Sequence, residues 1–208
     1  MSLQKNEFTV SSPVSPTMSL ELLLGPMFAG KSSAVLSIIR RHQALGWRVC
    51  SITHALDTRY SSAPAITNHD NISSPAVATT RLSDLADSAE LRDARLVVIE
   101  EAQFFPDLVA FVKNLVDVLG KHVVVVGLDG NAERAPFGEI LQLVPLADRV
   151  TKLTALCKRC GDGTPAIFTA ALSGEAVRSA AEGVPYVGTE TQYAALCRKH
   201  FLEQRGGY

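Results

Sequence analysis

The chain has 208 residues, a length that predicts one domain, or one domain with a small appendage, and excludes a large multidomain machine. Hydrophobic residues make up 47% and charged residues 20%, so a sizeable core can be buried and wholesale disorder is excluded. The formal net charge of -1 gives no global positive field that would hold nucleic acid.

The longest apolar runs fall far short of the roughly 18 residues that cross a bilayer, and the first residues lack the basic-then-apolar pattern of a secretory signal. We therefore expect a soluble, cytoplasmic protein with neither membrane nor nucleic acid as a partner. Residues 1–17 carry Ser and Pro without any periodic pattern, so we expect a disordered N-terminal extension.

The next segments predict a β-α-β unit: an apolar strand at residues 20–24, an amphipathic helix at 32–45 and a second strand at 47–52. The unbroken branched runs at 96–99 and 123–126 are typical of strands buried on both faces of a mostly parallel sheet, with a crossover helix at 108–119.

These elements predict an α/β domain over residues 18–153, in which helices cover a parallel sheet. The chain then becomes turn-rich around a short apolar run at 166–172. This change predicts a small lobe over residues 154–201 with too little apolar material to hold itself together. Residues 202–208 are expected to form a flexible tail.

A complete phosphate-loop motif, G-x-x-x-x-G-K-[ST], lies between the first predicted strand and the first predicted helix. Its glycines let backbone N–H groups turn inward around a polyphosphate, and the helix that follows presents its positive end. Lys31 is expected to reach the outer phosphates and Ser32 to ligate Mg²⁺. The predicted ATP-binding residues of this segment are Gly25, Met27, Phe28, Ala29, Gly30, Lys31, Ser32 and Ser33.

Two carboxylates, Glu100 and Glu101, follow the predicted strand at 96–99, at the edge where open α/β sheets bind their ligands. Successive strand residues point to opposite faces, so the two side chains should differ in role. We expect one to face the phosphate loop and hold Mg²⁺, usually through water, and the other to accept a proton from a substrate. A merely charged loop start is the alternative.

Other candidate residues give weaker signals. The segment Asp57-Thr58-Arg59-Tyr60 would suit a guanidinium that neutralises a transferring phosphoryl group, although alone it is typical of a solvated loop. Arg134 could contact phosphate and Phe137 could stack on a planar ligand, with surface or core roles equally open. His42 and His122 are expected at the surface.

Cys157-x-x-Cys160 and Cys197-x-x-His200 form two close pairs. Together they make a four-ligand set for one tetrahedral Zn²⁺, which would stabilise a lobe without a core of its own. The spacing leaves open a redox dithiol or unrelated thiols. Cys50, in the second predicted strand, is expected to be a buried apolar residue.

Taken together, these motifs resemble those of the type II (cytosolic) thymidine kinases, in the family's order and over roughly residues 19–201. The resemblance rests on the phosphate loop, Asp57-Thr58-Arg59-Tyr60, Glu101-Ala102-Gln103-Phe104-Phe105, Leu128-Asp129-Gly130, Arg134 with Pro136-Phe137-Gly138, and the two zinc half-sites. It implies a RecA-like P-loop sheet with helices on both faces, and a zinc lobe carrying a nucleoside-binding loop called a lasso. It also implies transfer of the ATP γ-phosphate to the 5′-hydroxyl of thymidine and deoxyuridine, in nucleotide salvage for DNA synthesis.

The resemblance implies catalytic roles for two residues, Glu101 as the general base and Arg59 as the transition-state arginine. Asp57 would assist through metal-bound water, and Glu100 with Ser32 would hold Mg²⁺. The family usually has Asp at the position of Glu100, so the carboxylate here is one methylene longer. A homotetramer and feedback inhibition by thymidine triphosphate are implied as well.

By the same resemblance the lasso closes over the nucleoside, with Thr169 near the thymine 5-methyl group and Phe104 against the ring. Ala132 replaces an aromatic residue that is usual before the Arg134 segment, which leaves one wall of the pocket looser. The residues expected to line this pocket are Met27, Phe104, Leu128, Phe137, Thr169, Val184, Val187, Gly188 and Tyr193.

Three other functions are alternatives to a thymidine kinase. A phosphate-loop NTPase that works as a switch or motor would use water as the acceptor, and the sequence has no N-K-x-D guanine-reading motif. A nucleic-acid module would need a basic, aromatic face, whereas residues 157–200 hold only scattered cations. A nucleoside monophosphate kinase should need additional arginines for the acceptor phosphate.

Overall fold

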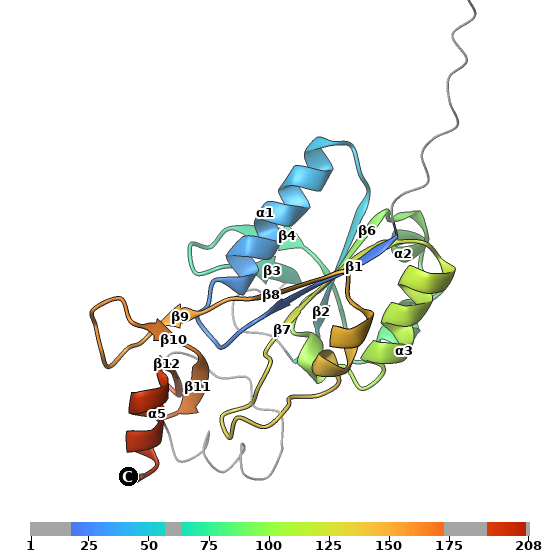
Figure 1. Cartoon of the computed structure of the whole chain (residues 1–208). Coiled ribbons are helices and arrows are strands. Elements are labelled where there is room, and N and C mark those ends of the chain that lie inside the picture. Colours follow the sequence, from blue (N-terminus) through green and yellow to red (C-terminus); the bar gives the residue numbers. More distant parts are fainter. Residues whose placement is uncertain (1–17, 57–63, 173–190, 207–208) are drawn as a thin grey trace, which may run out of the picture.

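The computed structural model describes residues 18–56, 64–172 and 191–206. Its centre is a six-stranded sheet in the order β5-β2-β6-β7-β1-β8, in which every neighbouring pair is parallel (Figure 1). The strands are β1 (Ser19–Leu24), β2 (Val49–His54), β5 (Val77–Thr79), β6 (Leu96–Ile99), β7 (His122–Gly127) and β8 (Arg149–Lys152). The predicted parallel sheet is confirmed.

Helical segments cover both faces of this sheet. They are α1 (Lys31–Ala44), α2 (Ala89–Asp93), α3 (Leu108–Lys113), the 3₁₀ turns η1 (Leu82–Leu85), η2 (Ala102–Phe104) and η4 (Ile140–Leu146), and the π-helical turn η3 (Asn114–Val118). The last described helix, α5 (Arg198–Gln204), lies away from this sheet (Figure 1). Figure 1 shows α1 on one side of the sheet and α3 on the other. Because alternate strand residues point to opposite faces, each layer has its own apolar cluster.

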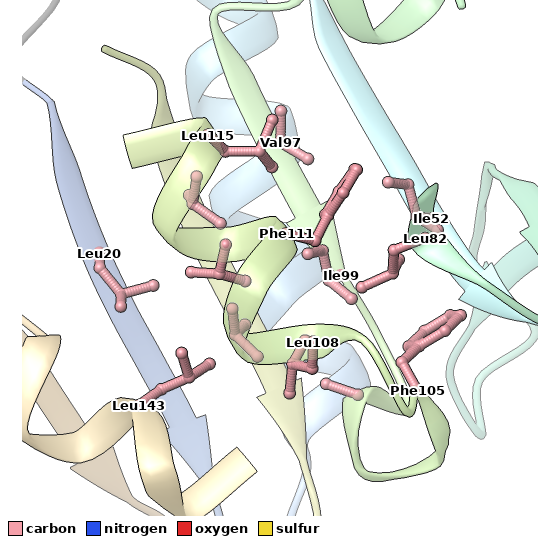
Figure 2. Close-up of a cluster of buried hydrophobic side chains, with 14 of the residues drawn as sticks. Leu20, Ile52, Leu82, Val97, Ile99, Phe105, Leu108, Phe111, Leu115 and Leu143 are labelled. Carbon is pink, nitrogen blue, oxygen red and sulfur yellow. The ribbon is translucent and has the colours of Figure 1, made fainter. Parts of the chain in front are cut away.

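The larger cluster lies between the sheet and the layer of α3 and η3. Figure 2 shows Leu108, Phe111 and Leu115 pointing toward Val97 and Ile99 of β6. The structure differs here from the predicted single helix at 108–119, because α3 gives way to the π-helical turn of η3. This wider turn keeps the adjacent Leu115 and Val116 both buried.

A small lobe follows the sheet domain in the chain. Its elements are the antiparallel pair β9 (Ala155–Leu156) and β10 (Pro165–Ala166), the antiparallel pair β11 (Phe168–Ala171) and β12 (Tyr193–Leu196), and α5. Figure 1 shows them gathered at one end of the molecule. Five of its buried residues are alanines, so little apolar area is removed from water there.

An additional hairpin, β3 (Ala65–Thr67) with β4 (Ser73–Pro75), packs Ile66 into the cluster beneath α1. The helix α1 matches its predicted bounds to within one residue, and α5 continues to Gln204, past the expected end of the lobe at residue 201. Among the described residues, no helix is both long enough and apolar enough to cross a membrane.

Two predictions near the start of the sheet need correction. The second strand begins at Val49, because Trp47 instead packs its ring against His42, 4.7 Å between centroids. The surface position predicted for His122 is wrong, because the residue is only 7% exposed. It begins the central strand β7, and its ring packs against that of His42 with 5.4 Å between centroids. Cys50 is buried as predicted, and burial raises the pKa of its thiol to about 11.

Candidate active site

The phosphate loop joins β1 to α1 through backbone conformations that favour glycine. Gly25 has φ 151°, and a Cβ atom there would lie 2.6 Å from the carbonyl oxygen of Leu153. Gly30 takes the left-handed conformation, φ 75°, directly before the helix. A side chain at Gly25 would therefore collide with the backbone, whereas Gly30 is favoured only by its left-handed conformation.

Lys31 and Ser32 begin α1 and carry the polar groups of the loop. The Lys31 Nζ atom donates to the carbonyl oxygens of Gly25 at 3.2 Å and Pro26 at 2.8 Å, which holds the ammonium group over the loop. The Ser32 hydroxyl donates to Glu100 Oε1 at 2.6 Å. This hydrogen bond joins the first turn of α1 to the end of β6. The Glu100 side chain, one methylene longer than the usual Asp, is only 5% exposed.

Glu101 leaves the sheet in a different direction from Glu100. It adopts the left-handed conformation, φ 51° and ψ 37°, which is uncommon for a residue other than glycine and costs on the order of 1 kcal/mol or more. Its Oε2 atom accepts a hydrogen bond of 2.5 Å from Gln103 Nε2. The prediction that the two carboxylates have separate environments therefore agrees with the geometry.

Gln103 is a functional candidate that the sequence reasoning missed. The residue is 3% exposed, and its Oε1 atom accepts a hydrogen bond of 3.0 Å from the backbone N–H of Leu128. One amide thus ties the Glu101 carboxylate to the chain that leaves β7. A Cβ atom at Gly127 would lie 2.4 Å from Gln103 Oε1, so that position must stay open.

Aromatic side chains line the region next to Glu101. The rings of Phe104 and Phe137 meet edge to face, 5.4 Å apart, and His54 lies 5.5 Å from Phe104. Burial lowers the pKa of His54, against the raising effect of Glu101, and His54 Nδ1 accepts a hydrogen bond from the Leu56 amide. The imidazole is therefore neutral at pH 7.

The small lobe contacts the phosphate loop through Thr169. Its hydroxyl accepts a hydrogen bond of 3.0 Å from the backbone N–H of Met27, and Thr169 is 4% exposed. Ala132 and Tyr193 are buried in one apolar cluster, against which Met27 and Phe28 pack. The junction thus brings together two residues of the phosphate loop, Met27 and Phe28, and two expected pocket residues of the lobe, Thr169 and Tyr193.

Several predicted residues fall elsewhere. Ser33 is exposed, and its Oγ accepts a hydrogen bond of 3.2 Å from Asn68. The guanidinium of Arg134 lies over Phe201 and Phe168, 5.1 and 5.5 Å from the ring centroids, so it faces the small lobe. Asp57, Arg59, Val184, Val187 and Gly188 lie outside the described residues.

The four predicted zinc ligands, Cys157, Cys160, Cys197 and His200, converge in space. Their ligand atoms all lie within 4.8 Å of one another, and His200 Nδ1 is 3.3 to 3.5 Å from the three sulfur atoms. Three thiols and an imidazole nitrogen at this spacing fit the donor set of a tetrahedral zinc site.

The surroundings of Cys157 favour a thiolate. Burial raises the pKa of the Cys157 thiol, but the backbone N–H of Cys197 and the ring of His200 outweigh it, so the pKa lies below its usual range. His200 Nε2 lies 3.8 Å from a carboxylate oxygen of Glu203, the type of neighbour that orients a metal-binding imidazole. These contacts support metal binding over a role as unrelated thiols.

Comparison with known sequences decides the family. The thymidine kinase family matches residues 18–201. The chain belongs to the thymidine kinase family. Its relatives include the cytosolic thymidine kinase of Homo sapiens, 37% identical over 196 residues, which are 94% of this chain and 78% of the human protein.

Further thymidine kinases show similar levels of identity. The cytosolic thymidine kinase of Bos taurus is 36% identical over 94% of this chain and 77% of its own length. The thymidine kinase of Sheeppox virus (strain KS-1) is 34% identical over 88% of this chain and 97% of its own length. The resemblance stated from the motifs is thereby confirmed.

We predict about one Zn²⁺ per chain, because the described cluster supplies one set of four donors. Metal analysis of purified protein measures this ratio. Cys197→Ser should remove most of the metal, since a site with three ligands binds zinc more weakly, whereas Cys50→Ala should retain it as a matched control. Active wild-type protein without zinc would contradict the assignment.

Proposed function

We propose that this chain is an ATP-dependent thymidine kinase, which transfers the γ-phosphate of ATP to the 5′-hydroxyl of thymidine and of deoxyuridine. The observation that carries the proposal is the separation of the two carboxylates. Glu100 accepts a hydrogen bond from the Ser32 hydroxyl at the phosphate loop. Glu101 instead accepts a hydrogen bond from the Gln103 side chain. A kinase needs one carboxylate for the metal and another for the acceptor hydroxyl.

The phosphate loop and Lys31 bind the polyphosphate of ATP. Ser32 and Glu100 fit the Mg²⁺ that accompanies it, because a hydroxyl and a carboxylate are hard oxygen donors. When bound, this ion neutralises negative charge on the transferred phosphoryl group. Asp57 and Arg59, outside the described residues, are proposed to assist through metal-bound water and to stabilise the transition state.

Glu101 acts as the general base. Its carboxylate takes the proton from the 5′-hydroxyl as the nucleoside oxygen forms its bond to the γ-phosphorus, while the bond to the β-phosphate oxygen breaks and ADP leaves. The hydrogen bond donated by Gln103 stabilises the ionised form of Glu101 and fixes its orientation. We propose Gln103 as a positioning residue for this step.

The aromatic pair Phe104 and Phe137 supplies a flat apolar wall for the base. Thr169 lies at the junction of the lobe with the phosphate loop, which suits its proposed place near the thymine 5-methyl group. The buried Ala132 lies against Tyr193, so the wall it forms is small. We propose that Leu128 with Val184, Val187 and Gly188 completes the nucleoside pocket.

The assembly and regulation proposed from the family are a homotetramer and feedback inhibition by thymidine triphosphate, in the cytoplasm. An exposed edge supports association, because β8 ends the sheet and Val150 on it is 43% exposed. Val144 and Leu146 nearby in the chain are 42% exposed each. The small lobe over residues 154–201 is proposed to depend on structural Zn²⁺.

An assay of ATP-dependent phosphorylation tests the activity. We expect product with thymidine and deoxyuridine, and none with deoxycytidine, deoxyadenosine or thymidine monophosphate, because the pocket is proposed to match a thymine edge. ADP release in the absence of nucleoside is the control. ADP release at the same rate with and without nucleoside would identify an NTPase and contradict the proposed kinase activity.

Glu101→Gln should lower kcat by about a hundredfold or more, because the neutral amide cannot accept the hydroxyl proton. Thymidine binding should persist, since the substitution preserves size. Glu90→Gln, on exposed α2, removes the same charge and should leave kcat unchanged. Near-normal turnover in Glu101→Gln would show that another residue is the general base.

Gln103→Leu should lower kcat at pH 7 by about tenfold or more, with a smaller change in KM, because the base loses a hydrogen bond to its charged form. The affinity for thymidine should stay close to that of the wild type, because Gln103 is proposed to orient the base and not to bind the nucleoside. Gln142→Leu, at an exposed position, is the matched control. A purely structural role of Gln103 would instead weaken thymidine binding and lower the thermal stability together with kcat.

A further inference from the structure

A second pocket lies far from the phosphate loop, at the opposite end of α1. Its volume is about 260 Å³, and it is lined by Glu21, Ile38, Arg41, His42, Trp47, His122 and Arg149. Its most distant lining residue on α1, His42, lies about 16 Å along the helix axis from Lys31, where the loop ends. Figure 1 shows this helix running from the loop to the start of the segment that leads into β2. The pocket is therefore distinct from the proposed active site.

Two imidazoles face each other in this pocket, with ring centroids 5.4 Å apart. His42 Nδ1 lies 2.8 Å from the carbonyl oxygen of Ile38, which can only accept, so the proton is on Nδ1. His122 Nδ1 forms a hydrogen bond with the Ser19 hydroxyl. His42 Nε2 makes no hydrogen bond within the described residues, whereas His122 Nε2 faces Glu21 Oε1 at 3.8 Å.

The charges around the pocket are predominantly positive. Glu21 is already paired with Arg149 at 2.5 Å, and His122 Nε2 lies 3.8 Å from its second oxygen. Arg41 makes no ion pair within the described residues and is exposed at the rim. The Arg41 guanidinium is thus available to bind an anionic ligand.

The apolar side of the pocket is fixed by Trp47. The guanidinium of Arg95 lies 3.8 Å from the centroid of its ring, and His122 meets the ring edge to face. Arg95 adds a further positive charge close to the pocket. A ligand here would meet an indole wall on one side and cationic donors on the other.

We propose that this pocket binds a small oxyanion, such as a phosphate or sulfate group. Arg41 would supply a charge-assisted hydrogen bond, and protonation of His122 would add a further positive charge to the lining of the pocket. Binding and protonation of His122 therefore reinforce each other. The proposal does not depend on the activity at the phosphate loop.

The pH dependence follows from the groups that face His122. They are Glu21 on β1, Arg41 and His42 on α1, Asp148 and Arg149 at β8, and Arg95 beside Trp47. Burial lowers the pKa of His122, and Glu21 opposes this effect. The empty pocket thus holds a neutral His122 ring at pH 7, and an anion should bind more tightly as falling pH protonates this ring.

The fluorescence of Trp47 tests the proposal directly, because the chain contains one tryptophan. Sulfate keeps its charge between about pH 6 and pH 8, so it is the probe, at constant ionic strength. We expect a saturable change in emission, with binding about threefold to tenfold tighter at the lower pH. A response that neither saturates nor depends on pH would overturn the proposal.

Arg41→Gln should weaken sulfate binding by about tenfold, whereas the adjacent Arg40→Gln, with the same change in charge but no place in the pocket lining, should have little effect. Equal effects would also overturn the proposal, because they would indicate a general field. The NMR shifts of the His42 and His122 rings give a second readout, and their failure to move on titration with sulfate would decide against binding.

Inorganic phosphate and thymidine monophosphate distinguish the sources of the anion. Tighter binding of the nucleotide would identify a phosphate ester that also uses the indole wall, and equal binding would identify the free ion. Both results support the site. The Glu101→Gln variant should lose kinase activity and still bind sulfate as the wild type does. The two proposals can therefore be tested independently.

Discussion

Parallel pairing of β1, β7 and β6 is the constraint on which the candidate active site depends. Leu24 at the end of β1 lies opposite Gly127 in β7, and Ile99 at the end of β6 lies opposite Val125. The chain therefore leaves all three strands at one edge of the sheet, with the phosphate loop after β1, the Leu128 amide after β7 and the paired glutamates after β6. A slip of one residue in any strand would turn its side chains to the other face and separate these groups.

Close packing around Gln103 then fixes what the strands bring together. Its side-chain amide touches Glu101 and the Leu128 amide, and its own carbonyl would clash with any Cβ atom at Gly138, 2.1 Å away. A buried amide with both ends satisfied is rigid, and a carboxylate held by it loses rotamer freedom before a substrate arrives. The left-handed backbone of Glu101 is stabilised by the same contacts.

The sequence predicted the parts of this protein that depend on local patterns. The phosphate loop, the branched strands and the Cys and His pairs each follow from spacing within a few residues, and the structure brings them together as expected. The role of Gln103 and the burial of His122 could not be predicted in this way. Both depend on neighbours distant in the chain, such as Leu128 for the amide and Ser19 for the imidazole.

The distribution of the four cysteines has a chemical consequence. Cys50 lies within the core with its pKa raised to about 11, so it reacts slowly with alkylating reagents at neutral pH. The other three thiols belong to the cluster with His200, in a lobe whose buried residues are largely alanine. The rate of alkylation of the native protein therefore reports the opening of that lobe, and with it the contact between Thr169 and the phosphate loop.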